Sequence, residues 1–501
     1  MNNIKITTLA IFTLSLTACT KDFDELNTSP ILVTEDLIQP SMLFTAAQKS
    51  SIFSTYENST FKEYSNYYTN EASGAIFQNR DWSTPFSNFQ GTLINTSEVI
   101  RLTSNRSDSI NENAMARIWK VWLFHQMTDA YGDLPYSEAL KNMDEAINQP
   151  KYDTQKDIYT DLLNQLKEAV ASLSDNADLA SFGDADLLYA GNVASWIRFG
   201  NSLRLRLALR VRYADPALAG QHITELAGQP MIESNDQNAK LTTIDGPDSD
   251  NRNPLYNDFV NSNGYPVYIG FTVTQELLKR DDPRLTIYAT PSVAPGPGYR
   301  GRPMTLSGEE KVPYGIDSVA YMQLSFQQAV QTIIVMNAAE VYFLRAEAAM
   351  AGLSTEDANE MYVNGIKASF EQYAVAGPDQ TTYLAGAFGN INSGTEEEKL
   401  ENIIVQKYLA MFNQGAEAWA EYRRTGYPTI WTGSDLGSTN GRIPRRATYP
   451  ASEYSLNSQN LDAAVGRLEG GDNMTSKVWW DAKPGLPLLN PRQGMFPPEI
   501  Y

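Results

Sequence analysis

Apolar residues recur every three or four positions over long stretches of the chain, which is the pattern of amphipathic helices. The pattern is clearest over residues 115–127, 158–173 and 400–411. Thr395 lies just before the last of these stretches, and Glu398 lies three residues after Thr395. This spacing is the signature of a capping box at a helix start. The chain is therefore expected to be mostly α-helical.

Two further helical stretches are close enough in sequence to form a pair. Residues 341–348 and 361–370 carry the helical spacing, and a short turn separates them. The pair resembles a degenerate tetratricopeptide unit at six positions, which are Leu344, Ala348, Gly352, Ala358, Tyr362 and Ile366. Stacked helix pairs form a rigid scaffold whose loops can carry a binding site. We therefore predict a tetratricopeptide-like helical bundle.

Residues 203–212 fit two patterns. Apolar residues alternate there with arginines, as in a half-buried strand. The segment also continues the helical spacing of Trp196, Phe199 and Leu203 without a break. We interpret it as a helix, and we expect its arginines to pair with some of the many carboxylates of the chain.

Two segments lack this periodicity and are rich in Pro, Gly, Asn and Asp. They cover residues 239–331 and 426–501, with only brief helical signals inside them. Such segments are expected to form long ordered loops over the helices, where binding residues usually lie.

The charge of the chain limits which functions are possible. Its formal charge is −20, from 39 basic and 59 acidic residues, so nucleic acid would meet a repulsive field and is excluded as a partner. The two histidines, His125 and His222, lie outside any metalloprotease or hydrolase motif. A histidine-based zinc site or a Ser-His-Asp triad therefore has no support.

Cys19 is the only cysteine, and the residues before it explain its position. Lys5 and the apolar run 6–18 have the charge and length of a signal peptide, and the run is too short to span a bilayer. Leu16–Cys19 resembles a bacterial lipobox, in which the signal is removed before a cysteine that then receives lipid chains. Two or more acyl chains hold a protein firmly on a membrane. The alternative is an ordinary secretory signal followed by an unmodified cysteine.

The residues after Cys19 bear on location. Thr20–Asp24 resembles the acidic surface-export tag of Bacteroidetes lipoproteins, which implies an outward-facing position on the outer membrane. No other long apolar run occurs in the chain, so no spanning segment is expected. We expect a signal peptide at residues 1–18 and one lipid-anchored ectodomain at residues 19–501.

Several blocks of sequence resemble the SusD/RagB family of nutrient-binding lipoproteins, and they keep the family's order over nearly the whole chain. These blocks are Asp129–Glu138, Trp196–Arg206, Asp282–Leu285, Leu344–Glu347, Glu417–Pro428, Arg442–Arg446 and Val478–Asp481. The resemblance implies a tetratricopeptide-like helical bundle under a loop-rich ligand face. It also implies a lid over a SusC-like, TonB-dependent barrel that imports oligosaccharides or, in some members, peptides. Members of the family bind and deliver, and they are not enzymes.

Most of these blocks are expected to be structural. In particular, we predict that Arg423, Arg424, Arg445 and Arg446 form buried ion pairs and do not contact ligand.

The segment 77–86 is a candidate ligand site, because it is a turn-rich loop before a helical stretch. Trp82 could lie against the apolar face of a sugar ring, while Asn79, Arg80 and Asp81 could bond its hydroxyl groups. The resemblance places this segment near the N-terminal wall of the family's pocket. The alternative is that Trp82 anchors the core.

Three tyrosines of the loop-rich middle segment are further candidates for ligand contact. They are Tyr265, Tyr268 and Tyr299. This segment also contributes aromatic residues to ligand sites in the family that the chain resembles.

Neither a cofactor nor a metal is expected from the motifs. Gly296–Gly301 satisfies the dinucleotide pattern only by its letters, because prolines flank it and no helix is predicted after it. An oxygen-rich cluster could bind calcium, but it fails the EF-hand spacing and is more simply a solvated turn. Its residues are Asp245, Asp248, Asp250 and Asn253.

Two other functions remain open alongside nutrient binding. A lipid-anchored glycan-cleaving enzyme would need two carboxylates about 5–10 Å apart in a cleft. A tetratricopeptide adaptor for another protein would need a concave groove free of loop insertions.

Overall fold

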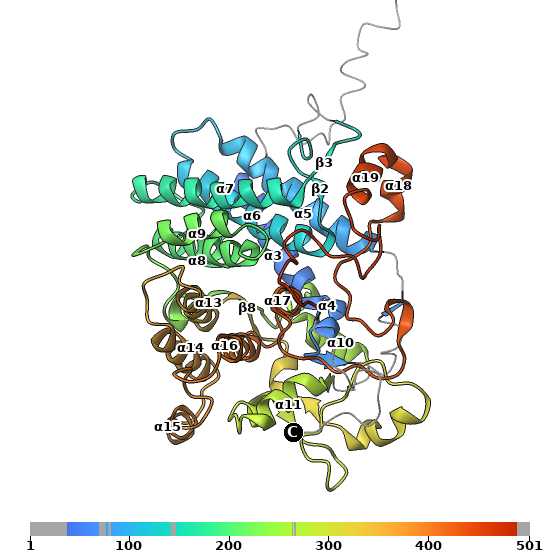
Figure 1. Cartoon of the computed structure of the whole chain (residues 1–501). Helices are drawn as coiled ribbons and strands as arrows, with labels where there is room; N and C mark the ends of the chain where they lie inside the picture. Colours follow the sequence, from blue (N-terminus) through green and yellow to red (C-terminus); the bar gives the residue numbers. More distant parts are fainter. Residues whose placement is uncertain are drawn as a thin grey trace, which may run out of the picture.

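The computed structural model describes residues 38–69, 77–78, 82–141, 147–262, 264 and 267–487. Helices dominate these residues, as the periodicity predicts (Figure 1). The longer ones are α3 (Pro40–Glu57), α5 (Ser83–Thr103), α6 (Ile110–Tyr131), α7 (Gln155–Asp175), α8 (Val193–Val211), α13 (Ala338–Met350), α14 (Ala358–Gln372), α16 (Glu396–Ala410) and α17 (Gly415–Thr425). The shorter ones are α4 (Ser59–Tyr64), α9 (Pro216–Glu225), α10 (Pro254–Asn261), α11 (Phe271–Lys279), α12 (Leu285–Tyr288), α15 (Gly377–Ala385), α18 (Ala451–Leu456) and α19 (Ser458–Val465).

Helices that follow one another along the chain pack side by side and form the predicted bundle. α5 packs on α6, α6 on α7, α7 on α8, and α8 on α9. The predicted helix pair is α13 and α14, and α13 also contacts α8 and α16, which joins the two halves of the bundle (Figure 1). The capping box of α16 is also confirmed, because Thr395 Oγ1 accepts from the backbone N–H of Glu398 while Thr395 N–H donates to the Glu398 carboxylate.

The strands among the described residues are short, and four of the eight lie in the loop-rich segment 239–331. They are β1 (Tyr68–Thr69), β2 (Leu134–Pro135), β3 (Tyr152–Asp153), β4 (Ala239–Thr242), β5 (Tyr268–Ile269), β6 (Ala289–Thr290), β7 (Tyr321–Met322) and β8 (Thr332–Met336). Among the described residues they form three small antiparallel sheets, with the orders β1-β5-β7-β6, β2-β3 and β4-β8.

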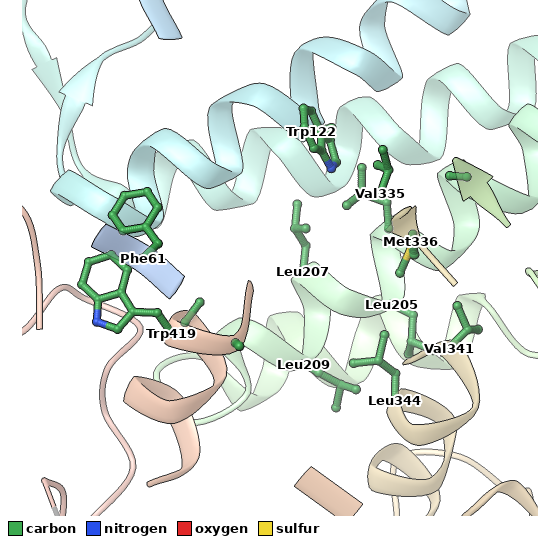
Figure 2. Close-up of a cluster of buried hydrophobic side chains, with 14 of the residues drawn as sticks. Phe61, Trp122, Leu205, Leu207, Leu209, Val335, Met336, Val341, Leu344 and Trp419 are labelled. Carbon is green, nitrogen blue, oxygen red and sulfur yellow. The ribbon is translucent and has the colours of Figure 1, made fainter. Parts of the chain in front are cut away.

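The alternating segment 203–212 lies in helix α8, which confirms the helical interpretation. The alternation arises because α8 is buried on nearly all sides, so both its leucines and its arginines face other elements. Figure 2 shows Leu205 and Leu209 on the side of Val341 and Leu344 of α13, whereas Leu207 points towards the side of Trp122 of α6.

The arginines of α8 pair with carboxylates, as the sequence predicts. Arg206 donates two hydrogen bonds of 2.7 Å to Glu340, one to each oxygen. Arg210 reaches Glu417 at 2.6 Å and Glu421 at 2.7 Å. All five side chains are at least nine-tenths buried. A buried charge is tolerated only when it is paired and hydrogen-bonded, so these pairs fix how α8 packs on α13 and α17.

Lys407 of α16 completes this network. Its Nζ lies 3.4 Å from Glu421, 3.6 Å from Glu417 and 3.8 Å from Glu340. Burial raises the pKa of Glu417, but Arg210, Arg206 and Lys407 outweigh this effect and hold the pKa below its usual value. Glu417 therefore stays ionised at neutral pH.

Three of the four arginines predicted to form buried ion pairs do so. The pairs are Arg424 with Glu347, Arg445 with Asp481, and Arg446 with Asp472. The prediction is wrong for Arg423, which donates to the carbonyl oxygens of Asp129 at 2.5 Å and Arg445 at 2.9 Å and stacks on Trp419. A guanidinium has five N–H donors in a fixed fork, so it can satisfy backbone carbonyls as readily as a carboxylate.

Lys62 is a buried lysine of helix α4, near the N-terminal end of the described residues. Its Nζ lies 4.0 Å from the centre of the Tyr56 ring, and its side chain is fully buried in α4. Burial lowers the pKa of Lys62 to about 7, against the opposing effects of Asp258 on α10 and Glu57 on α3. Lys62 is therefore expected to make the stability of the protein depend on pH.

In the unfolded chain Lys62 titrates near 10.5, so between pH 7 and 10 the unfolded state binds more protons and the native protein gains stability as the pH rises. We expect Lys62→Met to remove this gain and to stabilise the protein at pH 6, by on the order of a few kcal/mol. Urea unfolding at pH 6 and pH 9 measures both effects, with exposed Lys141→Met as the control. An unchanged pH dependence in Lys62→Met would contradict this expectation.

Candidate functional site

The four-stranded sheet organises the loop-rich part of the chain. Tyr68 pairs with Ile269 and Thr69 with Tyr268, so the end of β1 lies beside β5 although 200 residues separate them. Tyr268 also pairs with Tyr321 of β7. Three remote segments therefore meet at one tyrosine that the sequence singled out.

The ring of Tyr268 is half-buried and is held in place by two neighbours. It stacks on Tyr321 with 5.5 Å between ring centres and 27° between planes. The guanidinium carbon of Arg302 lies 5.2 Å from the centre of the Tyr268 ring. A ring that is fixed by its neighbours and still partly open to solvent is suited to stack on the C–H face of a sugar.

A small apolar cluster, separate from the main core, packs against this tyrosine. Its buried members are Phe271, Leu306, Tyr314, Val319 and Trp431, and Tyr268 packs against them. Trp431 comes from the second loop-rich segment and is 4% exposed, so it acts here as a core residue. Sequence reasoning missed Tyr321, Arg302 and Trp431, because no local pattern marks residues that meet only through the fold.

Tyr299 belongs to the same region as Tyr268. The segment that follows it runs beside β5, since Arg302 N–H donates to the carbonyl of Ile269 at 2.9 Å and Phe271 N–H donates to the carbonyl of Arg302 at 3.0 Å. Tyr299 itself is half-buried against the main core. The fold therefore brings these two predicted tyrosines to one loop-rich face, which we define by Tyr268, Tyr299, Arg302 and Tyr321.

Four of the predicted ligand residues lie outside the described part of the chain, as does Cys19. They are Asn79, Arg80, Asp81 and Tyr265. Two residues that precede Asn79 are described: Phe77 is buried, and Gln78 accepts a hydrogen bond of 2.9 Å from Ser438. Ligand contact by these four residues stays a prediction.

Trp82 lies in the core. Its side chain is 1% exposed, and its ring stacks on Phe61 with 6.0 Å between ring centres. The Tyr64 ring packs against it at a tilt, and the hydroxyl of Tyr131 donates to the Trp82 carbonyl at 2.9 Å. Of the two interpretations that the sequence left open for Trp82, the core anchor is the one that these contacts support.

The oxygen-rich cluster 245–253 is engaged in its own turn. Asp245 pairs with Arg252 at 3.0 Å, and Asp248 accepts from the backbone N–H of Asp250 and from Asn251. The Asn253 amide donates to two backbone carbonyls. Within the described residues no group of three or more His, Cys, Asp or Glu side chains is arranged to hold a metal ion. These contacts support the interpretation of the cluster as a turn.

Comparison with known proteins defines the class of the chain. Residues 31–450 match the SusD-like family described as starch-binding and associating with the outer membrane, and the chain therefore belongs to this family. The resemblance seen in the sequence blocks is confirmed. No match was found among curated proteins.

Solved structures similar to the chain include two described as chitin-binding. One is a chitin-binding protein with 27% identity and a TM-score of 0.78, covering 88% of this chain and 100% of that one. The other is a chitin-binding SusD homologue from Flavobacterium johnsoniae, with 28% identity, a TM-score of 0.77, and coverage of 89% and 99%. A SusD homologue from Bacteroides uniformis shows 28% identity, a TM-score of 0.75, and coverage of 89% and 100%.

None of the helices in the described part of the chain combines the length and the apolar composition that crossing a bilayer requires.

Proposed function

We propose that this protein is a surface lipoprotein that binds a neutral oligosaccharide on its loop-rich face and delivers it to a SusC-like, TonB-dependent barrel. The observation that carries the proposal is the half-buried Tyr268 ring, fixed by Tyr321 and Arg302 on that face. Membership of the SusD-like family supports it, because the family is described as starch-binding and outer-membrane-associated.

The proposed ligand is a glycan of the chitin type. Two similar structures are described as chitin-binding, at 27% and 28% identity. A sugar offers apolar C–H faces for the aromatic ring and hydroxyl groups for polar neighbours, as ligand pockets generally require. The acidic net charge is compatible with such a neutral ligand and disfavours a polyanionic one.

The proposed location follows from the start of the chain. Lipid chains on Cys19 would hold the protein on the outer membrane, and the acidic tag after it would direct the protein outwards. A SusC-like barrel transporter is the proposed partner, as membership of the SusD-like family implies.

The two rival functions find less support in the structure. Glu417 and Glu421 come close together, but both are buried and accept hydrogen bonds from Arg210, so they cannot serve as the open carboxylate pair of a glycosidase. The pocket of about 630 Å³ beside the α13–α14 turn could suit an adaptor, but its Arg345 is paired with Glu233 and Glu356.

Calorimetric titration of the purified Cys19→Ala chain with N-acetylglucosamine hexamer tests the proposal, with maltohexaose and a mixed peptide pool as comparisons. We expect saturable binding of at least one glycan, and chromatography of the mixture should show no shortened oligosaccharide. Shortened products would favour the enzyme, and binding of peptides alone would contradict the glycan proposal.

A further inference from the structure

A cavity lies inside the helical bundle. It is lined by residues of α3, α4, α6, α8, β8 and α17 and of the turn between α16 and α17. Most of the side chains that line it are apolar. Figure 2 shows four of these side chains, which come from four different elements: Phe61, Trp122, Val335 and Trp419. The cavity leaves about 50 Å³ for the centres of water-sized spheres.

One side of the cavity is polar, and three of its side chains are almost fully buried. Asn413 is 4% exposed, Glu417 8% and Arg423 0%. Among the described residues, Thr55 Oγ1, Asn413 Oδ1 and Arg423 Nη2 have no hydrogen-bond partner, and Glu417 Oε1 has only an ion-pair contact of 3.6 Å with Lys407 Nζ. Buried polar atoms are almost always hydrogen-bonded, so four such atoms on residues that line one cavity point to a polar occupant.

The charges around the cavity balance. Arg206 and Arg423 face Asp129 and Glu417, and burial lowers the pKa of the adjacent His125 to about 3, so this histidine is neutral. An ion would upset this balance at a high desolvation cost. The four atoms without a hydrogen bond include two acceptors, Asn413 Oδ1 and Glu417 Oε1, and two donors, and a hydroxyl group can satisfy both kinds.

The cavity is large enough for such an occupant and has a route to solvent. About 10–15 Å³ on this measure holds one water, so the space accepts about three to five water-sized groups. Thr55, Gln126 and Gln414 of its lining are half-exposed. Thr55 and Phe61 also line a surface pocket of about 330 Å³ between the α3–α4 junction and α5.

We propose that this cavity is a second binding site, for a small neutral hydroxylated molecule held by Thr55, Asn413, Glu417 and Arg423. Its occupant is either a cluster of solvent waters or a polyol of similar size, both of which offer the same hydroxyl chemistry. The site is independent of glycan binding at Tyr268, so either proposal can fail without the other.

Thr55→Val tests for a polar occupant, because it replaces the hydroxyl by a methyl group of the same shape. If the hydroxyl is bonded to an occupant, the melting temperature should fall, by about 2 °C. If the cavity is dry, removal of an unsatisfied buried hydroxyl should leave the melting temperature unchanged or raise it, which would overturn the proposal.

Asn413→Gly provides a second variant that the backbone tolerates. Asn413 has a φ of +74°, a conformation that glycine adopts freely, so the substitution removes the acceptor without strain. Exposed Asn440 has a φ of +54° and supplies the matched control Asn440→Gly. We expect a larger fall in melting temperature for Asn413→Gly than for the control, and equal falls would count against the site.

Crystals of the full-length protein grown with and without glycerol distinguish the two sources of the occupant. Separate water peaks on Asn413 Oδ1, Glu417 Oε1 and Arg423 Nη2 in both crystals would identify solvent. Continuous density in the glycerol crystal alone would identify a polyol. A cavity without density in both crystals would overturn the proposal.

Discussion

Replacing Arg424 by methionine is expected to destabilise the folded protein by roughly 3–5 kcal/mol, because two buried carboxylates lose the hydrogen bonds that its guanidinium donates. Arg424 donates to both oxygens of Glu347, at 2.5 and 2.6 Å, and to both oxygens of Glu421, at 3.0 and 2.7 Å. All three side chains are at least nine-tenths buried, so water cannot replace the lost bonds. Urea unfolding of the variant measures the loss.

An exposed arginine supplies the control for this experiment. Arg106 pairs with Asp108 at 3.2 Å, but the two side chains are 51% and 71% exposed. Exposed ion pairs contribute little to stability, so Arg106→Met should unfold almost as the wild type does. Similar losses for the two variants would show that burial does not set the strength of the α8–α13–α17 network.

The second large effect is expected for Trp82→Ala, which should cost roughly 3–5 kcal/mol of folding free energy. The reason is the cavity that remains when a ring 1% exposed is removed from between Phe61 and Tyr64. Trp82→Phe keeps an aromatic ring in the site and should cost less. Thermal unfolding measures both losses.

Glycan affinity of the folded Trp82→Ala protein distinguishes the two interpretations of this residue. A core anchor predicts unchanged affinity with a large fall in melting temperature. Unchanged melting with weakened binding would instead make Trp82 a stacking platform and would place the ligand beside this residue.

Local signals in the sequence predict the helices well. The capping box at Thr395 and the turn at Gly352 correspond to real helix boundaries, because capping and left-handed turns depend on neighbouring residues alone. The helix at 203–212 was harder to predict, since its buried arginines imitate the alternation of a strand.

Partners that are remote in sequence could not be predicted. The sequence indicates that the arginines of α8 pair with carboxylates. However, Glu340 lies 134 residues from Arg206, and Glu417 lies 207 residues from Arg210. Among 59 acidic residues nothing local selects these two. The partners follow only from how α8 packs on α13 and α17.

The candidate site shows the same limit. Tyr268 could be proposed from its place in a loop-rich segment, but strands of two residues leave no periodic signal that would pair it with Thr69 and Tyr321. For Trp82 the local sequence misleads. Its turn-rich surroundings favour an exposed site, whereas Phe61 and Tyr64 of the preceding helix α4 bury its side chain.

The central claim is tested most directly by measuring the affinity of Tyr268→Ala for the glycan identified by calorimetry. Tyr268→Phe and Tyr454→Ala are measured in the same way as controls. Tyr454 is 42% exposed on α18, outside the loop-rich face, so its removal should not affect binding. We expect Tyr268→Ala to bind about three- to tenfold more weakly, as the loss of one stacking contact implies, and Tyr268→Phe to bind as the wild type does. A folded Tyr268→Ala protein with wild-type affinity would contradict ligand binding at the loop-rich face.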